Sequence, residues 1–256
     1  MRVLLIGGTG LISTSITHQL VGRGHDVTLY NRDRSETRFP DKVKRITGDR
    51  GDFAAFERQM RATKPFDCVI DMVCFRPDEA ESLIRAFHGR AGQLIFCSTV
   101  DVYARPTRLF PITEDEPRGG VSEYGRNKVR CEEILLAAHR SGAFPVTVIR
   151  PAMTYGEGGV LIHSFGWSTT FLDRIRKGRP VIVHGDGQSL WTACHIDDVA
   201  RAFVGAVGNA RAHGKCYHAT GEEWMTWNDY HETVAQALGA PKPALVHIPT
   251  DLLGAI

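Results

Sequence analysis

The chain has 256 residues, of which 43% are hydrophobic and 23% charged, as in ordinary globular proteins that form one large α/β unit or two modest domains. A formal net charge of +2, without blocks of like charge, gives no basic surface for nucleic acid. The six cysteines have no C-x-x-C spacing, the eleven histidines have no H-E-x-x-H spacing, and no apolar run approaches the roughly 18 residues of a membrane span, so we expect no disulfide framework, no metal site and no membrane segment. Because the chain begins directly in a strand-like run without a signal-peptide pattern, we expect a cytoplasmic protein.

Short apolar runs alternate with helix-like segments through the first part of the chain. We predict strands at 3–7, 26–31, 43–49, 67–73, 93–99 and 145–151, and helices at 11–23, 52–63, 77–88 and 122–141. Strands that are apolar at nearly every residue and alternate with helices of about ten or more residues are typical of βαβ units, whose parallel sheet is covered on both faces. The pattern predicts an α/β fold with a Rossmann-type, doubly wound parallel sheet.

The first strand-like run leads directly into the glycine-rich sequence GGTGLIS at 7–13 and then into a predicted helix. Glycines at a strand-to-helix turn let the backbone approach a pyrophosphate closely, and the start of the helix supplies free amide donors. Ser13 stands where the fingerprint ends in glycine, and a serine is small enough for the helix to pack closely. We therefore predict a dinucleotide-binding turn whose contacts come from Gly7, Gly10, Leu11 and Ile12.

The end of the second strand indicates which dinucleotide is bound. A carboxylate there would hydrogen-bond the ribose hydroxyls of the adenosine, whereas an arginine accommodates a 2′-phosphate. The chain has Asn31 and Arg32 at this point, with Arg34 close behind, which favours NADP over NAD, although Asn31 can itself bond a ribose hydroxyl. Asp49, at the end of the third strand, is placed to reach the adenine amino group or to cap the helix that begins near Asp52.

Tyr124 and Lys128 lie four residues apart just ahead of the helix-favouring run at 131–138. Positions four apart share one face of a helix, so the phenol and the ammonium group can sit side by side. An ammonium beside a tyrosine favours the phenolate and lowers the tyrosine pKa, which makes the phenol a usable proton shuttle. A Tyr-x-x-x-Lys pair also occurs by chance in many surface helices, so the rest of the chain has to decide between the two interpretations.

The pattern changes after Pro151 and later returns. A glycine-rich turn and a helix-like stretch around 164–177 are followed by residues 190–208, which resume the earlier strand and helix style. We predict a dinucleotide-binding domain at 1–151 to which 190–208 returns, and a smaller interwoven C-terminal substrate-binding region at 152–189 and 209–256. Because the chain stops soon after the strand-like run at 244–249, we expect a C-terminal element to be missing.

Five segments in this order resemble the extended short-chain dehydrogenase/reductase family, particularly its NAD(P)-dependent epimerase/dehydratase branch, over nearly the whole length. GGTGLIS resembles the cofactor turn of the family, STVDVY the end of its active-site strand and YGRNK its Tyr-x-x-x-Lys pair. IRPAMTYG resembles its Arg-Pro-x-x-x-Tyr-Gly segment, and GDGQSLWTACHIDDVARAF the return of the chain from its substrate domain. A helix-pair homodimer is usual for the family.

The resemblance implies roles for four residues. Tyr124 would be the acid/base acting on a substrate hydroxyl, and Lys128 would bond the nicotinamide ribose and lower the pKa of the tyrosine. Thr99 stands four residues before Tyr103, as in the Ser/Thr-x-x-x-Tyr spacing of the family, and would be the hydroxyl partner, with Ser98 as the fallback. A base against the oxygen suits a reaction in which the cofactor takes a hydride from the attached carbon, and a hydroxyl donor would stabilise charge on that oxygen. The alternative for Thr99 is a strand-end hydroxyl that caps its own backbone.

Two positions depart from the family. The sugar-nucleotide 4,6-dehydratases follow the threonine with an Asp-Glu pair, whereas this chain has Val100 and Asp101, so Asp101 is a substrate contact, an isolated base or an exposed carboxylate. Relatives that bind nucleoside diphosphates often carry an arginine where this chain has Trp191, which can stack on a base or sugar but cannot neutralise phosphate. Other candidate lining residues of the substrate pocket are Tyr155, His163, Trp167 and His195, and other candidate anion clamps are Arg174, Arg176 and Arg179.

Three hypotheses follow. The first is an epimerase that oxidises a hydroxyl of a sugar, such as a nucleotide sugar, and returns the hydride. The second is an NADP(H)-dependent reductase or dehydrogenase of a small substrate, which the tryptophan at 191 keeps open. The third is a non-catalytic NADP(H) sensor or RNA-binding protein. A sensor has no need of a proton shuttle, and the charge balance disfavours RNA, so we expect an enzyme with NAD or NADP as cofactor.

Overall fold

A computed structural model describes residues 1–32, 39–159 and 161–253. The chain forms two compact units. The first comprises Met1–Thr154 and Ile196–Thr220, and the second comprises Tyr155–His195 and Gly221–Ile256. No helix of the described ranges has both the length and the apolar composition needed to cross a membrane.

The first unit is built on a seven-stranded parallel sheet in the order β11-β6-β5-β4-β1-β2-β3. Its strands are β1 (Arg2–Ile6), β2 (Asp26–Asn31), β3 (Lys44–Thr47), β4 (Cys68–Asp71), β5 (Leu94–Cys97), β6 (Val146–Pro151) and β11 (Cys216–Ala219). The chain adds β2 and β3 on one side of β1 and then crosses to the other side with β4. The strand order therefore reverses between β1 and β4, at the place where α/β sheets of this topology bind ligands beyond the carboxyl ends of the strands.

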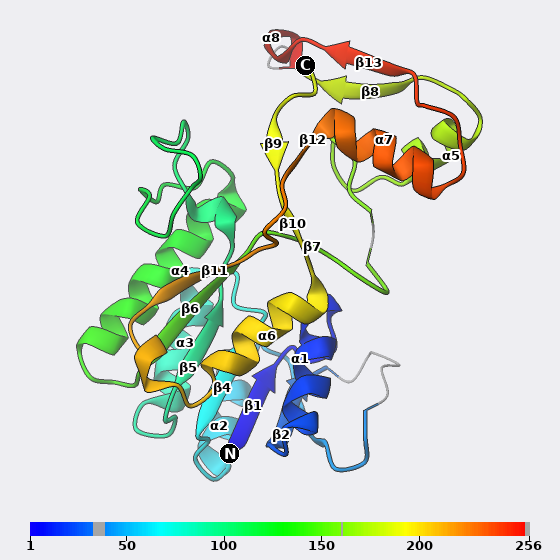
Figure 1. Ribbon diagram of the computed structural model, residues 1–256. Helices are drawn as coiled ribbons and strands as arrows, with labels where there is room; N and C mark the ends of the chain where they lie inside the picture. The colour runs from blue at the N-terminus through cyan, green and yellow to red at the C-terminus, as the bar shows by residue number, and fades with distance from the viewer. Residues whose placement is uncertain (33–38, 160, 254–256) are drawn as a thin grey trace. The chain divides into compact units, whose positions relative to one another are not determined.

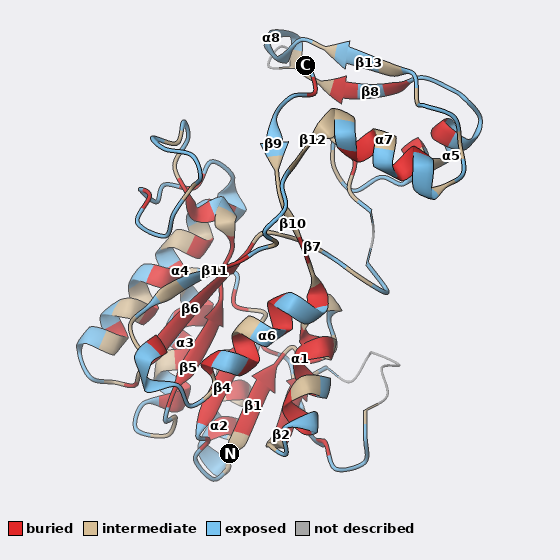
Figure 2. Ribbon diagram, in the orientation of Figure 1, coloured by how far each residue is buried: buried red, intermediate tan, exposed pale blue. Residues whose placement is uncertain are grey.

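Helices cover both faces of this sheet (Figure 1). On one face α1 (Leu11–Gly22) packs against α6 (Ile196–Ala206), and on the other α3 (Pro77–Phe87) lies between α2 (Phe53–Ala62) and α4 (Glu123–Arg140). The strands β1, β4, β5 and β6 are buried along almost their entire length, because both of their faces meet helices (Figure 2). The predicted Rossmann-type α/β fold is confirmed.

The second unit is smaller. Its β8 (Val181–His184) pairs in parallel with β13 (Leu245–Ile248), and β9 (Leu190–Trp191) pairs antiparallel with β12 (Met225–Thr226). The helices α5 (Thr170–Arg176) and α7 (Trp227–Ala237) contribute to one apolar cluster with β8, and α8 (Thr250–Leu253) follows β13. The short strands β7 (Met153–Tyr155) and β10 (Ala193–His195) lie where the chain passes from one unit to the other.

The boundaries of the two units differ from the predicted domain boundaries where the chain returns to the first unit. The chain re-enters the first unit at Ile196 and leaves it after Thr220, whereas the sequence pattern placed the return at 190–208. The difference arises because β11, which the pattern did not reveal, hydrogen-bonds to β6 and extends the large sheet by one strand. The assignment of a dinucleotide role to the first unit and a substrate role to the second remains a proposal.

Candidate active site

The glycine-rich turn lies at the carboxyl end of β1, beside the reversal of strand order. Gly7 has φ +83°, a conformation that favours glycine, and a Cβ built on it would lie 2.5 Å from Cγ1 of Val73. A Cβ on Gly8 would lie 2.5 Å from Cδ2 of Leu29. The two glycines therefore allow the turn to sit tightly between β2 and the segment that follows β4. This is the close backbone approach that a pyrophosphate site requires.

Ser13 does more than replace a small residue. Its hydroxyl accepts a hydrogen bond from the amide of Gly10 at 2.8 Å and donates one to the carbonyl of Gly7 at 2.7 Å, so it ties together the two ends of the turn. Gly10 is the N-cap of α1, and the helix leaves the amides of Leu11 and Ile12 without acceptors of its own. The predicted contacts thus meet at one helix start, where free amides and the partial positive charge of α1 would suit an anion.

The residues predicted to contact the adenosine lie at the ends of β2 and β3. Asn31 ends β2, and Arg32 follows it as an exposed residue, whereas Arg34 lies outside the described residues. Asp49 is exposed, and its carboxylate accepts the amide of Gly51 at 2.8 Å. The cap of α2 is Asp52, which accepts the amide of Ala55, so the alternative capping role of Asp49 is wrong.

Tyr124 lies in the first turn of α4, close to the end of β5. Ser122 caps this helix by accepting the amide of Gly125 at 2.9 Å. Gly125 is required there because a Cβ would lie 2.4 Å from the carbonyl oxygen of Asp101. This close approach places the side chain of Tyr124 within a hydrogen bond of Thr99. The hydroxyl of Thr99 also accepts the amide of Asp101 at 3.2 Å, so it serves as a cap as well as a partner of the phenol.

Lys128 follows one turn later and is 1% exposed. Its Nζ donates to the carbonyl of Cys74 at 2.8 Å and to that of Cys97 at 2.7 Å, and it lies 5.7 Å from the ring centroid of Tyr124. Two of its three donors are therefore committed to the segment that follows β4 and to the end of β5. The expected register is present, since the ammonium and the phenol lie on one face of α4.

The pKa of Tyr124 does not follow the expectation. Although Tyr124 is 41% exposed, partial desolvation of its side chain raises the pKa of Tyr124 to about 12. Cys97 and Asp101 act in the same direction, and the hydrogen bond with Thr99 lowers the pKa. The expectation that Lys128 lowers the pKa of Tyr124 is wrong for the protein without bound dinucleotide. The ammonium group of Lys128 points to two backbone carbonyls instead. At neutral pH the phenol therefore keeps its proton.

Ser98, the fallback partner, is engaged elsewhere. Its hydroxyl donates to Glu132 at 2.6 Å, and Glu132 also accepts from Arg150 at 2.9 and 2.7 Å and from Arg118 at 2.9 Å. Arg150 in turn donates to the hydroxyl of Tyr103 at 2.7 Å. This buried network lies beneath the strand end that carries Thr99, and it leaves Thr99 as the hydroxyl available to Tyr124.

Asp101 is exposed in the short 3-10 helix η1 (Val100–Val102), which follows β5. It lines a pocket of about 230 Å³ together with five neighbours. The other lining residues are Val100, Tyr103, Arg105, Val121 and Ser122. Carboxylate, guanidinium and hydroxyl groups thus surround a space next to the segment that carries Thr99.

The remaining predicted substrate residues belong to the second unit. The ring of Tyr155 meets His195 edge-on at 5.4 Å. Trp191 stacks on Trp227 at 4.7 Å and 14°, so one of its ring faces is already covered. Of the other candidates, His163 is buried whereas Trp167 is exposed, and Arg174, Arg176 and Arg179 are exposed.

The residues present suit a nicotinamide dinucleotide. The close-packed glycine turn, the free amides at the start of α1 and the polar ends of β2 and β3 supply, in order along the sheet, what pyrophosphate and adenosine require. Within the described ranges there is no group of three or more His, Cys, Asp or Glu side chains arranged to hold a metal ion.

Sequence reasoning missed the buried charges. Asp71 ends the buried strand β4, Arg150 lies in the buried strand β6, and Glu132 stands on the buried face of α4. A charged residue in a fully buried strand is almost always paired, and this could have been used as a signal from the sequence.

Comparison with known proteins bears on these observations. The family model described as "NAD dependent epimerase/dehydratase family" matches residues 3–219. The chain is 30% identical to the 2'-dehydrokanamycin reductase of Streptomyces kanamyceticus over 94% of its own length and 68% of that protein. It is 28% identical to the chloroplast stem-loop binding protein of 41 kDa b of Arabidopsis thaliana, over 96% of its own length and 65% of that protein.

A solved structure shows the same fold. The chain superposes on the NAD complex of the Thermus thermophilus UDP-glucose 4-epimerase with a TM-score of 0.79 and 23% sequence identity, covering 97% of this chain and 86% of that one.

Proposed function

Because the chain belongs to the NAD dependent epimerase/dehydratase family and is an enzyme of that type, we propose that it interconverts a secondary alcohol and a ketone on a sugar or sugar-like substrate. The observation that carries this proposal is the phenol of Tyr124, which is hydrogen-bonded to Thr99 and shares one face of α4 with Lys128. A nicotinamide dinucleotide held at the glycine-rich turn would supply the hydride chemistry of this interconversion. The first unit is the proposed dinucleotide domain, and the second the proposed substrate domain.

The proposed proton chemistry follows from the side chains. In the direction of reduction, Tyr124 gives its phenolic proton to the ketone oxygen, and Thr99 donates a hydrogen bond to the same oxygen as negative charge develops on it. In the direction of oxidation, the phenolate takes the hydroxyl proton back. Lys128 holds the segment after β4 and the end of β5 through the carbonyls of Cys74 and Cys97, and its third donor would be offered to the nicotinamide ribose.

Two net reactions fit this chemistry. An epimerase oxidises a sugar hydroxyl, keeps the reduced dinucleotide and returns the hydride to the other face, and this reaction suits the family. A reductase consumes NADPH and is supported by three observations: a tyrosine that is protonated at neutral pH, the tryptophan at 191 in place of an anion clamp, and a relative named 2'-dehydrokanamycin reductase.

The dinucleotide that the purified protein carries distinguishes the epimerase from the reductase. We expect denaturation of freshly purified chain, followed by mass spectrometry, to release NAD or NADP. Retention near one molecule per chain, with substrate isomerised and no net change at 340 nm, supports the epimerase. An empty site that binds NADPH reversibly and oxidises it in step with a ketone substrate supports the reductase. A chain that binds neither dinucleotide would refute the proposal.

We also propose a preference for NADP, which rests on Arg32 at the end of β2 and the lack of a carboxylate at Asn31. Replacing Arg32 with alanine is expected to weaken NADP binding about ten-fold, because a charge-assisted hydrogen bond to the 2′-phosphate contributes on the order of 1.5 kcal/mol, while NAD binding stays within about two-fold. Titration calorimetry with both dinucleotides measures this. The exposed Arg58 on α2 provides the matched control, R58A. An equal loss for both dinucleotides would remove the preference.

A further inference from the structure

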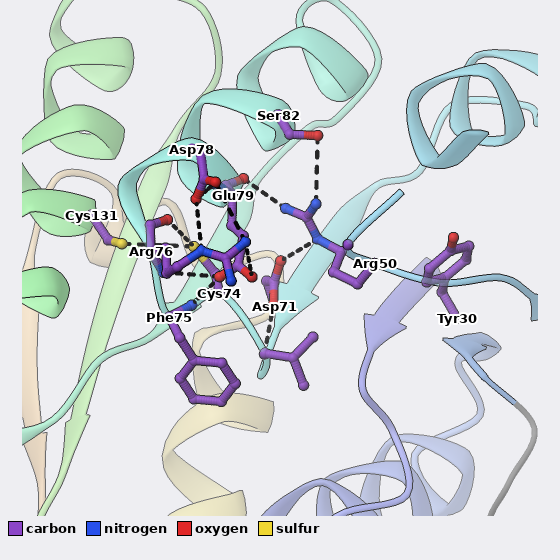
Figure 3. Close-up of polar contacts among 12 residues, drawn as sticks. Tyr30, Arg50, Asp71, Cys74, Phe75, Arg76, Asp78, Glu79, Ser82 and Cys131 are labelled. Atoms are coloured by element: carbon purple, nitrogen blue, oxygen red, sulfur yellow. Dashed lines mark hydrogen bonds and ion pairs between the residues drawn. The ribbon is translucent and has the colours of Figure 1, made fainter. Parts of the chain in front are cut away.

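A buried ion pair lies at the carboxyl end of β4, beneath the proposed dinucleotide site (Figure 3). Nε of Arg50 faces Oδ2 of Asp71 at 3.6 Å, with the two side chains 9% and 0% exposed. Within the described chain, neither of these two atoms has a hydrogen-bond partner. Burial raises the pKa of Asp71, and the charge of Arg50 and the hydrogen bond from the amide of Val73 oppose that rise. Taking two charges out of water is costly, and such a pair is weak evidence of a role in stability alone.

Arg50 connects the end of β3 to α3. It directly follows Asp49, whose carbonyl accepts a hydrogen bond from the hydroxyl of Tyr30 at 3.3 Å. The guanidinium group of Arg50 donates a hydrogen bond to the carbonyl of Glu79 at 2.6 Å and lies 4.2 Å from the ring centroid of Phe56. The loop that carries Asp49, on the adenosine side, is thereby fixed to the layer of helices below it.

Asp71 connects the pair to the segment that follows β4. Its Oδ1 accepts the amide of Val73 at 2.7 Å, and Val73 is the residue that packs against Gly7 of the dinucleotide turn. The next residue, Cys74, accepts the hydrogen bond from Lys128 at 2.8 Å. The carboxylate of Asp71 thus sets the backbone that supports both the turn and the ammonium group.

The same segment is anchored a second time. The carboxylate of Glu79 accepts the amides of Phe75 at 2.6 Å and of Arg76 at 2.9 Å, which forms the start of α3 (Figure 3). Arg50 reaches the backbone of Glu79, so its side chain touches both ends of residues 71–79. One guanidinium therefore fixes the whole wall of the site between β4 and α3.

We propose that Arg50 and Asp71 are positioning residues for the dinucleotide, which hold the loop of Asp49, the support of Gly7 and the acceptor of Lys128 in one arrangement. This inference rests on the dinucleotide role of the first unit. If the inference holds, the affinity of the folded protein for the dinucleotide depends on the pair of Arg50 and Asp71, although neither side chain contacts the dinucleotide.

The test is the double substitution R50M/D71N. It removes both charges, so no buried charge is left unpaired, and asparagine keeps an acceptor for Val73. Dissociation constants for NAD and NADP are measured by titration calorimetry at a temperature where circular dichroism shows each variant to be folded. We expect both constants to rise about ten-fold or more, because displacement of supporting groups by about 1 Å is costly at a binding site.

Alkylation gives an independent readout. Cys74 is buried, with its Sγ 3.9 Å from that of Cys131. Peptide mass spectrometry after iodoacetamide treatment is expected to show faster labelling of Cys74 in R50M/D71N than in the parent. The matched control is R85M/E57Q, which removes a more exposed ion pair of 2.9 Å between α2 and α3 and is expected to keep the dissociation constants within about two-fold.

The outcomes are distinct. A folded R50M/D71N variant that binds both dinucleotides like the parent overturns the inference, whatever its melting temperature. If the double variant does not fold, R50K and D71N replace it: R50K keeps a cation beside Asp71 and is expected to bind more tightly than D71N, and parent-like affinity in both overturns the inference. A parent that binds neither NAD nor NADP would instead refute the proposed function.

Discussion

Replacing Tyr124 with phenylalanine is expected to lower turnover by a factor of about 10² to 10⁴ while leaving dinucleotide affinity nearly unchanged. The substitution removes only the hydroxyl group that is proposed to exchange the proton with the substrate oxygen. The ring remains in the first turn of α4, and the close contact of Gly125 with the carbonyl of Asp101 is retained. The loss should therefore appear in kcat and not in the dissociation constant of the dinucleotide.

Tyr217 provides the matched control. It is an exposed tyrosine of β11 in the same unit, so Y217F removes a phenolic hydroxyl far along the sheet from the dinucleotide turn without touching the proposed proton path. We expect its rate to equal that of the parent. Equal rates in Y124F and the parent, measured with a substrate that the parent turns over, would contradict the assignment of Tyr124 as the acid/base.

The raised pKa of Tyr124 adds a pH dependence. Since its pKa is about 12, the phenolate fraction grows roughly ten-fold for each pH unit from neutrality towards that value. The rate of alcohol oxidation limited by proton removal should therefore rise with pH, whereas ketone reduction, which needs the protonated phenol, should not. In Y124F the rise should be absent.

The sequence was sufficient to predict the sheet, the dinucleotide turn and the register of Tyr124 and Lys128. These features depend on local signals: apolar runs of strand length, glycines between a strand and a helix, and a spacing of four in a helix that Ser122 caps. Each of the six predicted strands of the first part overlaps an observed strand of the large sheet. In these segments the local sequence pattern and the tertiary fold favour the same secondary structure, as is expected of natural sequences.

The features that escaped prediction depend on contacts between distant segments. The strand β11 is short and only partly buried, and its place beside β6 is set by the sheet and not by its own pattern. The pKa of Tyr124 was misjudged because the ammonium of Lys128 is held by two carbonyls from distant parts of the chain, that of Cys74 after β4 and that of Cys97 in β5. The stacking of Trp191 likewise escaped prediction. Its partner, Trp227, lies 36 positions away in the chain, and local spacing cannot reveal such a contact.

The largest expected effect on stability comes from Glu132. Its carboxylate accepts hydrogen bonds from two groups of Arg150, from Arg118 and from Ser98, with Glu132 and Arg150 at 0% and 2% exposure. Replacing it with glutamine keeps the shape but leaves a buried guanidinium without its counter-charge. We expect the first unit to lose about 3–5 kcal/mol of unfolding free energy.

The measurement must report on the first unit. All four tryptophans, at 167, 191, 224 and 227, lie in the second unit, so their fluorescence reports on that unit, whereas far-ultraviolet circular dichroism also follows the large sheet. Urea titration of E132Q should shift the dichroism transition well below that of the parent. The exposed Glu133 supplies the control, E133Q, which is expected to lie within about 0.5 kcal/mol of the parent.

Acidic pH should lower the unfolding free energy of the parent, as the E132Q substitution does at neutral pH. Burial alone would raise the pKa of Glu132, but the hydrogen bonds and charge of Arg150, with Ser98 and Arg118, lower it overall. A carboxylate with a lowered folded-state pKa stabilises the fold fully above its unfolded pKa of about 4.3 and loses that contribution as the pH falls through the folded value. The difference in unfolding free energy between parent and E132Q should therefore shrink below about pH 4. A constant difference across that range would show that the stabilisation by Glu132 does not depend on ionisation of its carboxyl group.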